Sequence, residues 1–204
     1  MKVTKIEPVT KTKYKVYLEE QFAFVLYKGE LSRFGLQEGK DISQDKVSQI
    51  KEEVVEKRAK LRTLYLLNQM DRTEMQLRMK LKKDLYTDDI IEKAISYAAS
   101  FGYISDLNFA NCFIQNKKNS KSKKEIIFLL HQKGISRDII EKTIEENYQE
   151  EETIDVLHRL LEKKHFVAEE ATDKEKKKML DYLLRRGFSY EDIRQVIQVS
   201  LWNA

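Results

Sequence analysis

The stretch that decides the fold runs Leu81-Lys-Lys-Asp-Leu-Tyr-Thr-Asp-Asp89-Ile90-Ile91. In it, a leucine is followed eight residues later by an aspartate and nine residues later by an isoleucine that opens another apolar helix. The same spacing recurs in Leu130-His-Gln-Lys-Gly-Ile-Ser-Arg-Asp138-Ile139-Ile140 and in Leu184-Arg-Arg-Gly-Phe-Ser-Tyr-Glu-Asp192-Ile193-Arg194. A short spacing that returns about every 50 residues is typical of stacked helical units. Such units present a long surface to a partner rather than enclose a reaction, so the pattern favours a binding protein.

Composition places the chain among soluble proteins that are rich in helix. It has 204 residues, of which 35% are charged and 41% hydrophobic, with six glycines and one proline. Few turn-forming residues indicate long helices. The longest uncharged run, residues 94–105, is too short to cross a bilayer, and the first residues lack the apolar stretch of a signal peptide. A single cysteine excludes an internal disulfide and suits a reducing compartment. We therefore expect a cytoplasmic protein with no membrane association.

The first 40 residues differ from the rest because their apolar residues alternate. Residues 14–18 and 22–26 each show period two, which predicts strands, and residues 2–6 add a third strand that ends near Pro8. The connection Glu19-Glu20-Gln21 lacks the Asn-Gly or Asp-Gly pair that favours a tight hairpin. A short helix is expected around residues 31–34, ended by Gly35.

From Ser43 onward, apolar residues recur at helical spacing. The first helix shows one apolar stripe with a charged residue in its middle, formed by Val47, Ile50, Val54, Arg58, Leu61 and Leu64. The segment Thr73-Glu-Met-Gln76 has the pattern of a capping box and predicts a new helix start. Polar residues suited to capping precede the three later helices, namely Thr87, Ser136 and Ser189.

These elements predict a mainly α fold. It consists of three tandem three-helix repeats stacked into an elongated curved array, with a small N-terminal β-hairpin or sheet as a cap. The expected division is an N-terminal strand region with a short helix (1–42), a linking helix with the first repeat (43–104), the second repeat (105–148) and the third repeat (149–204). Neighbouring repeats must stack, because one repeat cannot bury its hydrophobic face alone.

Nothing in the sequence points to catalysis. The soft metal ligands are His131, His158, His165 and Cys112, without paired cysteines or a His-Glu motif, so we expect no metal site. Cys112 shares a helix with Phe109 and Phe113 and is interpreted as a small packed residue. The glycines are scattered, which excludes a Gly-rich phosphate loop, and no carboxylate pair stands out as an acid and base. We expect no enzyme, no catalytic residue and no cofactor.

Charge is distributed in alternating blocks, although the net charge is only +4. Basic residues dominate 57–83, 117–133 and 174–186, whereas acidic residues dominate 138–155. Such blocks are either solvated helix faces or contacts to a patterned partner, such as a protein or a protein–nucleic acid complex. The third helix of each repeat begins with carboxylates (Asp88-Asp89, Asp138, Glu191-Asp192), which argues against reading of duplex DNA in a groove.

Three segments resemble a known family of bacterial regulators. The run Arg72-Thr73-Glu74-Met75-Gln76-Leu77-Arg78-Met79-Lys80-Leu81 is similar to the R-S/T-E-x-x-L-x-x-K-L segment of the RecX family. Residues 102–114, from Gly102-Tyr103 through Phe109-Ala110 to Phe113, resemble that family's Gly-Tyr to Phe-Ala signature. Residues 126–135 resemble its I-x-x-x-L-x-x-K-G-I segment. One departure is the polar loop 119–124, where members often carry a glycine. Tyr103, Phe109 and Phe113 are expected to pack in the core.

The resemblance implies regulation of the RecA recombinase in DNA repair, recombination and the SOS response. Members bind RecA and its filament on single-stranded DNA and mainly limit filament growth, ATPase and strand exchange. We expect a monomer that contacts the filament through basic faces, and a weak direct contact with DNA stays open. The candidate contact residues are Lys80, Lys82, Lys83, Lys117, Lys118, Lys121, Lys123, Lys124, Lys133, Arg185 and Arg186.

Two other functions remain open at this point. A non-specific single-stranded DNA-binding protein would act by competition, but such proteins interleave aromatic residues with a basic groove. Here the aromatic residues fall mainly on apolar stripes, which counts against that function. A structural scaffold unrelated to recombination is the third alternative.

Overall fold

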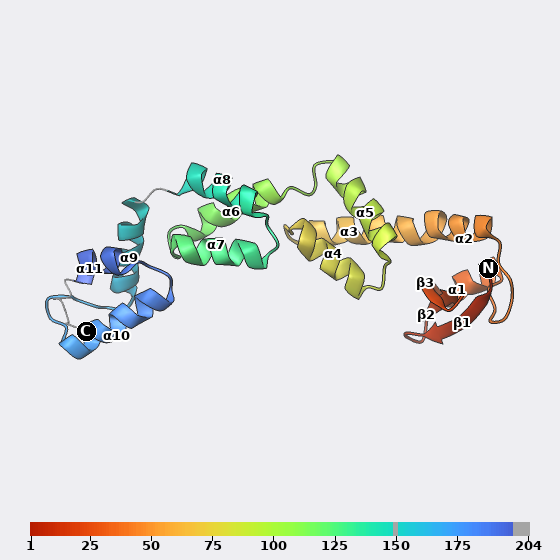
Figure 1. Ribbon diagram of the computed structural model, residues 1–204, viewed down its shortest axis with the longest axis horizontal. Helices are drawn as coiled ribbons and strands as arrows, with labels where there is room; N and C mark the ends of the chain where they lie inside the picture. Colours follow the sequence, from red (N-terminus) through yellow and green to blue (C-terminus); the bar gives the residue numbers. More distant parts are fainter. Residues whose placement is uncertain (149–150, 198–204) are drawn as a thin grey trace. The chain divides into compact units, whose positions relative to one another are not determined.

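The protein, analysed as a computed structural model, is mostly helical, and the structure describes residues 1–148 and 151–197. Three strands come first, β1 (Val3–Pro8), β2 (Lys13–Leu18) and β3 (Gln21–Tyr27). The helices that follow are α1 (Lys28–Phe34), α2 (Gln44–Ile50), η1 (Lys51–Glu56), α3 (Lys57–Gln69), α4 (Glu74–Lys83), α5 (Asp88–Ser100), α6 (Asp106–Lys117), α7 (Lys123–Gln132), α8 (Arg137–Asn147), α9 (Glu151–Lys163), α10 (Asp173–Arg185) and α11 (Tyr190–Ile197) (Figure 1).

The chain divides into two compact units, Met1–Ser105 and Asp106–Ala204. The predicted fold class, mainly α with a small N-terminal sheet, is confirmed. The finer division of the chain into four segments remains a proposal. The end of the proposed third repeat, residues 198–204, lies outside the described residues.

The N-terminal sheet is antiparallel with the order β1-β2-β3, so the predicted hairpin is present. Its β2–β3 turn places Glu19 at φ 48° and Glu20 at φ 67°, in the left-handed region that tight hairpin turns require. Glutamate seldom adopts this conformation, but β1 stabilises the turn. The Glu19 amide donates to the Lys2 carbonyl at 3.0 Å, and the Glu20 amide donates to Thr4 Oγ1 at 3.0 Å. Tertiary hydrogen bonds thus replace the missing turn residues.

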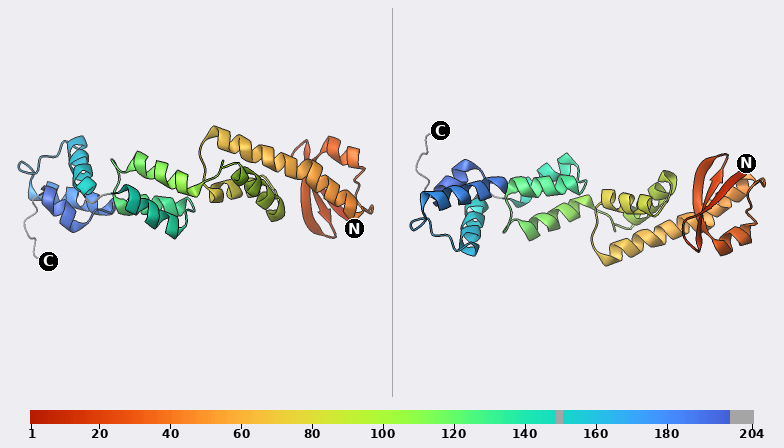
Figure 2. Two further views of the ribbon diagram at one scale, coloured as in Figure 1. Left: turned by 90° about the horizontal axis from the view of Figure 1, so that it is seen from above. Right: turned by 90° about the horizontal axis from the view of Figure 1, so that it is seen from below.

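The long helix α2–η1–α3 buries Val47 and Ile50 as the sequence predicts, but beyond Ile50 it buries a different face from the predicted one. Val55 and Ala59 are buried in place of Val54, whereas Leu61 is 68% exposed. The reason is the π-helical segment η1, in which each turn holds one more residue than an α-helical turn. Every side chain after η1 is therefore rotated relative to an uninterrupted α-helix. Figure 2 shows this helix running beside the sheet.

Helix α5 packs on α3, and a shared carboxylate joins them at the surface. Glu56 accepts hydrogen bonds from Lys60 at 2.7 Å and from Lys93 of α5 at 2.9 Å. These two ammonium groups lower the pKa of Glu56 below its ordinary value. The carboxylate therefore stays charged at neutral pH and links the two helices.

Three repeats share one connection between their second and third helices. Each second helix ends at a residue with positive φ: Leu85 (66°), Gly134 (83°) and Gly187 (84°). The next amide donates to a leucine carbonyl five residues back, at 3.2 Å for Tyr86 to Leu81, 3.2 Å for Ile135 to Leu130 and 3.3 Å for Phe188 to Leu183. This pattern is the Schellman motif. It corrects the third copy of the predicted repeat by one residue, because buried Leu183, not the 41% exposed Leu184, holds the equivalent position.

One of these three positions is strained. Leu85 adopts the left-handed conformation that the other two repeats assign to glycine. For a residue with a Cβ atom this conformation costs about 1–2 kcal/mol. Since a glycine would avoid that cost, the leucine side chain at this position needs a separate explanation.

The second unit contains two hydrophobic clusters. One lies within α6, α7 and α8 around Ile114, Ile126 and Leu130, and the other within α9, α10 and α11 around Leu157 and Leu183. The predicted packing of Cys112 is wrong, because Cys112 is exposed. Helix α6 buries Ala110 and Ile114, which lie one turn apart, and Cys112 is two residues from each, on the opposite face.

Ser122 links the two clusters of the second unit. Its hydroxyl accepts the Glu125 amide at 3.1 Å, which caps the N-terminus of α7, and donates to the Arg186 carbonyl at 2.5 Å. The approach is close because residue 187 is a glycine. A Cβ atom on Gly187 would lie 2.9 Å from Ser122 Oγ and 3.1 Å from Lys124 Cβ.

Candidate partner-binding surfaces

In the first unit, a small cavity on α4 is lined by cations, one amide and one thioether. Its volume is about 290 Å³, and its lining residues are Arg72, Gln76, Met79, Lys80 and Lys83. Residues three and four apart share one face of a helix, so Gln76, Lys80 and Lys83 stand in a row. No carboxylate belongs to this lining among the described residues. We call this site the α4 basic pocket; it brings together two predicted contact residues, Lys80 and Lys83.

Local hydrogen bonds fix the α4 basic pocket. Thr73 and Gln76 form the predicted capping box, with the Gln76 amide donating to Thr73 Oγ1 at 3.2 Å. Arg72 Nε donates to the Leu66 carbonyl at 3.3 Å and so ties the start of α4 to the end of α3. Met79 is 62% exposed and supplies an apolar contact beside the ammonium groups. The site is thus preorganised for an anionic partner group with an apolar neighbour.

Lys82, on the same helix, does not line this pocket. Its ammonium group pairs with Asp88 at 3.3 Å across the α4–α5 connection. Both side chains are highly exposed, so the pair contributes little to stability. The structure therefore separates Lys82 from Lys80 and Lys83.

In the second unit, the Ser122–Arg186 hydrogen bond brings two distant basic segments together. Ser122, just before α7, contacts Arg186, just after α10, and Gly187 lies against Ser122 and Lys124. Within this group, Lys121 pairs with Glu125, and Arg186 lies over the Tyr182 ring at 5.0 Å. We call this group the junction basic surface; it contains the predicted residues Lys121, Lys124 and Arg186, and Arg185 adjoins it in sequence. The predicted residue Lys123 lines a different cavity, together with Arg137 and Glu141 of α8.

The remaining predicted residues belong to other environments. Lys133 lies over the stacked rings of Phe109 and Phe113, at 5.6 and 5.3 Å from their centres. These half-buried rings hold the ammonium by cation–π attraction, so Lys133 has an intramolecular role. Lys117 and Lys118 lie at the end of α6, in the segment that leads to the junction basic surface.

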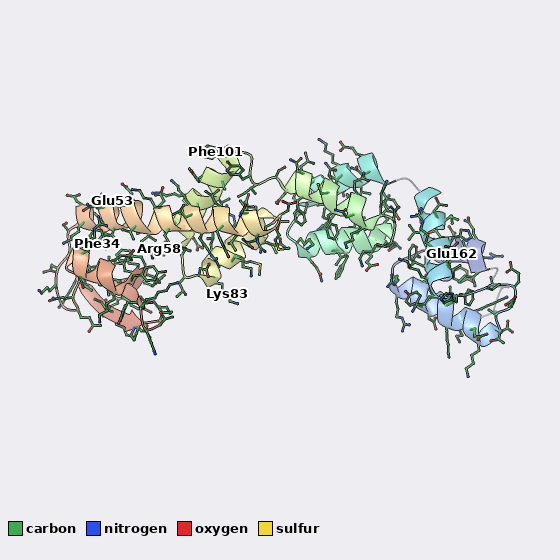
Figure 3. All side chains as sticks on the ribbon, turned by 180° about the vertical axis from the view of Figure 1, so that it is seen from behind. Phe34, Glu53, Arg58, Lys83, Phe101 and Glu162 are labelled. Atoms are coloured by element: carbon green, nitrogen blue, oxygen red, sulfur yellow. The ribbon has the colours of Figure 1, made fainter. Side chains whose placement is uncertain are left out.

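Several exposed aromatic residues could not be recognised as such from the sequence. Tyr65, Phe101 and Tyr103 are each more than half exposed, and Phe101 stands at the end of α5 (Figure 3). Phe101 stacks on Tyr103 with ring centres 5.8 Å apart. The expectation that Tyr103 packs in the core is therefore wrong; Ile104, the next residue, packs against the core instead.

Two further features, a metal-binding cluster and a membrane-spanning helix, are both absent from the described part of the chain. Among the described residues, no group of three or more His, Cys, Asp or Glu side chains is placed to hold a metal ion. Within residues 1–148 and 151–197, no helix has the length and apolar character needed to span a bilayer.

The fold and these surfaces define a helical repeat protein with an N-terminal sheet and separate basic patches. Family models described as the first and third three-helix domains of RecX match residues 59–97 and 150–197. The regulatory protein RecX of Caldanaerobacter subterraneus subsp. tengcongensis is 30% identical over 190 residues, covering 93% of this chain and 94% of that protein. The regulatory protein RecX of Clostridium acetobutylicum is 31% identical, covering 96% and 94%. The chain belongs to the RecX family.

Solved structures show the same fold. A crystal structure of a regulatory protein RecX has a TM-score of 0.64 at 23% identity and covers 97% of this chain and 98% of its own. The crystal structure of RecX from Lactobacillus salivarius has a TM-score of 0.57 at 24% identity and covers 70% of this chain and 94% of its own.

Proposed function

We propose that this protein binds the RecA recombinase and its filament on single-stranded DNA, and that it limits filament growth, ATPase and strand exchange. The observation that carries the proposal is membership of the RecX family along nearly the whole chain. The protein acts as a non-enzymatic cytoplasmic monomer, without a cofactor, during DNA repair and recombination. The predicted contact residues, foremost Lys80 and Lys83, remain proposals.

The geometry supports binding at more than one place. Each unit carries a basic surface of its own, the α4 basic pocket in the first and the junction basic surface in the second. A filament repeats the same surface groups on successive protomers, so one chain can bind several of them. Contacts made from one chain raise the overall affinity without any single strong contact.

Acidic residues complement this arrangement. Asp138, Glu145 and Glu146 of α8 are exposed, and they suit a basic patch on the partner. A partner with both signs of charge, such as a protein filament, matches these faces better than a uniformly anionic polymer.

A second candidate function is non-specific binding of single-stranded DNA. The observation in its favour is the set of exposed rings next to cations. Arg62 lies 5.5 Å from the Tyr65 ring, and Lys60 lies 4.8 Å from the Tyr97 ring, which contacts Phe101. Aromatic rings beside cations are typical of surfaces on which bases stack.

One binding experiment distinguishes the two functions. Labelled protein is titrated with RecA filaments assembled on oligo-dT and, in the same buffer, with the same oligo-dT alone. We expect the filament to bind about tenfold or more tightly, a difference of about 1.4 kcal/mol or more. Equal affinity for the oligonucleotide alone would favour DNA competition and contradict the proposed recognition of the recombinase.

A further inference from the structure

The first unit holds a second cavity, of about 480 Å³, that shares no residue with the α4 basic pocket. It lies between strand β3, helix α3 and the connection from α4 to α5. Its polar lining is Lys13, Arg58, Arg62 and Asp84. Its apolar lining includes Val25, Leu61 and Leu85, beside the rings of Tyr27 and Tyr86. A pocket of this size that combines apolar walls with a few converging polar groups is typical of binding sites.

Arg58 is held rigidly at the cavity wall. It donates to the Val25 carbonyl at 3.1 Å, pairs with Glu30 and lies 4.6 Å from the Tyr27 ring centre. Figure 3 shows Arg58 on the side of α3 that faces the sheet. Arg62 Nε is fixed by Asp84 at 2.7 Å. Both guanidinium groups are therefore preorganised, which lowers the entropic cost of binding.

The charge of the cavity selects the class of ligand. Lys13, Arg58 and Arg62 are cationic, while Glu30 and Asp84 neutralise the two arginines. One net positive charge remains. A single carboxylate matches that charge, whereas a phosphate chain would meet the Asp84 carboxylate. The α4 basic pocket, with three cations, is the better anion site of the two.

Two leucines of the cavity wall, Leu61 and Leu85, occupy positions that are unfavourable for a leucine, one because it is exposed and one because its φ is positive. Leu85 keeps a leucine side chain at a left-handed position where the other repeats carry Gly134 and Gly187. Leu61 is 68% exposed, because the π-helical segment η1 turns it away from the buried face of the helix. Strained backbone and π-helical turns both concentrate at functional sites. Here both bring a leucine side chain to one cavity.

We propose that this cavity docks a peptide segment of a protein partner in which a carboxylate stands next to a large apolar side chain. The carboxylate accepts hydrogen bonds from Lys13 and from the guanidinium N–H groups of Arg58 and Arg62 that make no hydrogen bond within the described part of the chain, and the apolar side chain packs between Leu61 and Leu85. We call the site the sheet–α3 pocket. The proposal goes beyond binding of the recombinase through basic surfaces and does not depend on it.

The probe is the blocked peptide acetyl-Gly-Phe-Glu-Gly-amide. Its binding to the full chain is followed by the ¹H–¹⁵N chemical shifts of the backbone amides and of the arginine Nε–H groups. We expect shifts at Arg58 Nε and at the Leu61 and Leu85 amides, with a dissociation constant of about 1 mM. Peptides with Gln for Glu, or with Ala for Phe, should bind several-fold more weakly. Absence of shifts at these positions would overturn the proposal, and so would larger shifts there with hexathymidylate than with the peptide.

Variants distinguish a loss of peptide docking from a loss of folded structure. Leu85→Asn removes the apolar wall but suits the left-handed backbone, so the melting temperature should not fall while peptide binding weakens about fivefold. Leu61→Glu, at an exposed position, should weaken binding at least as much. Phe128→Glu, 59% exposed on α7, is the matched control and should leave binding unchanged. Unchanged peptide binding in Leu85→Asn and Leu61→Glu would overturn the proposal.

Discussion

Replacement of both Lys80 and Lys83 by glutamate is expected to weaken binding to the RecA filament about 100-fold in 0.1 M salt, because like charges then face the acidic partner surface. The two lysines line one pocket and have no ion pair among the described residues, so reversal removes attraction without breaking an internal bond. Filament binding measured against salt concentration checks this: the variant should also show a smaller salt dependence.

The matched control reverses two cations elsewhere in the same unit. Lys46 and Lys57 are exposed on α2 and α3, and Lys46→Glu with Lys57→Glu changes the net charge by the same amount. We expect at most a threefold or so loss of affinity, since distant exposed charges are screened. If both double variants lose affinity equally, total charge governs binding, and the α4 basic pocket is not a specific contact.

The second large effect concerns stability. Gly187→Ala is expected to lower the free energy of unfolding of the second unit by about 3 kcal/mol. Part of the loss, about 1–2 kcal/mol, is the left-handed backbone conformation at φ 84°. The remainder arises because the new Cβ atom would lie 2.9 Å from Ser122 Oγ. Ser122 cannot move away without losing the α7 cap and the bond to Arg186. Urea unfolding followed by circular dichroism measures the change.

Substitutions at two other glycines distinguish the contribution of the backbone conformation from that of the close approach to Ser122. Gly102 has φ 72°, and a Cβ atom added there would have nothing within 4 Å, so Gly102→Ala should cost only the contribution of the left-handed backbone, about 1–2 kcal/mol. Gly29 lies inside α1, without positive φ and with open space around it, and Gly29→Ala should stabilise by about 0.5–1 kcal/mol. A loss in Gly187→Ala no larger than in Gly102→Ala would show that the close approach to Ser122 contributes nothing.

The local features of the fold could be predicted from the sequence because they depend on neighbouring residues. Period-two alternation located β2 and β3, and the Thr73 capping box located the start of α4. The buried face of α3 could not be predicted, since apolar Leu61 and Leu64 fit an uninterrupted α-helix as well as Val55 and Ala59 fit the observed one. Hydrophobic spacing does not reveal a single π-helical turn, which changes the phase of the face beyond it.

The candidate sites were predictable only in part. Lys80 and Lys83 are three residues apart, so their shared helix face follows from sequence. The contact of Ser122 with Arg186 depends on tertiary packing and could not be predicted. The sheet–α3 pocket was missed, although two signals were present: Arg58 interrupts an apolar stripe, and Leu85 stands where two repeats have glycine.

The central claim is that this chain regulates RecA by binding its filament, and the ATPase rate of RecA on saturating single-stranded DNA tests it most directly. The rate is measured while the protein is added up to one copy per RecA protomer. We predict a progressive fall in ATPase together with shorter filaments, and a much weaker effect of the Lys80→Glu, Lys83→Glu variant at the same concentrations. Unchanged ATPase and unchanged filament length at that ratio would contradict the proposed function.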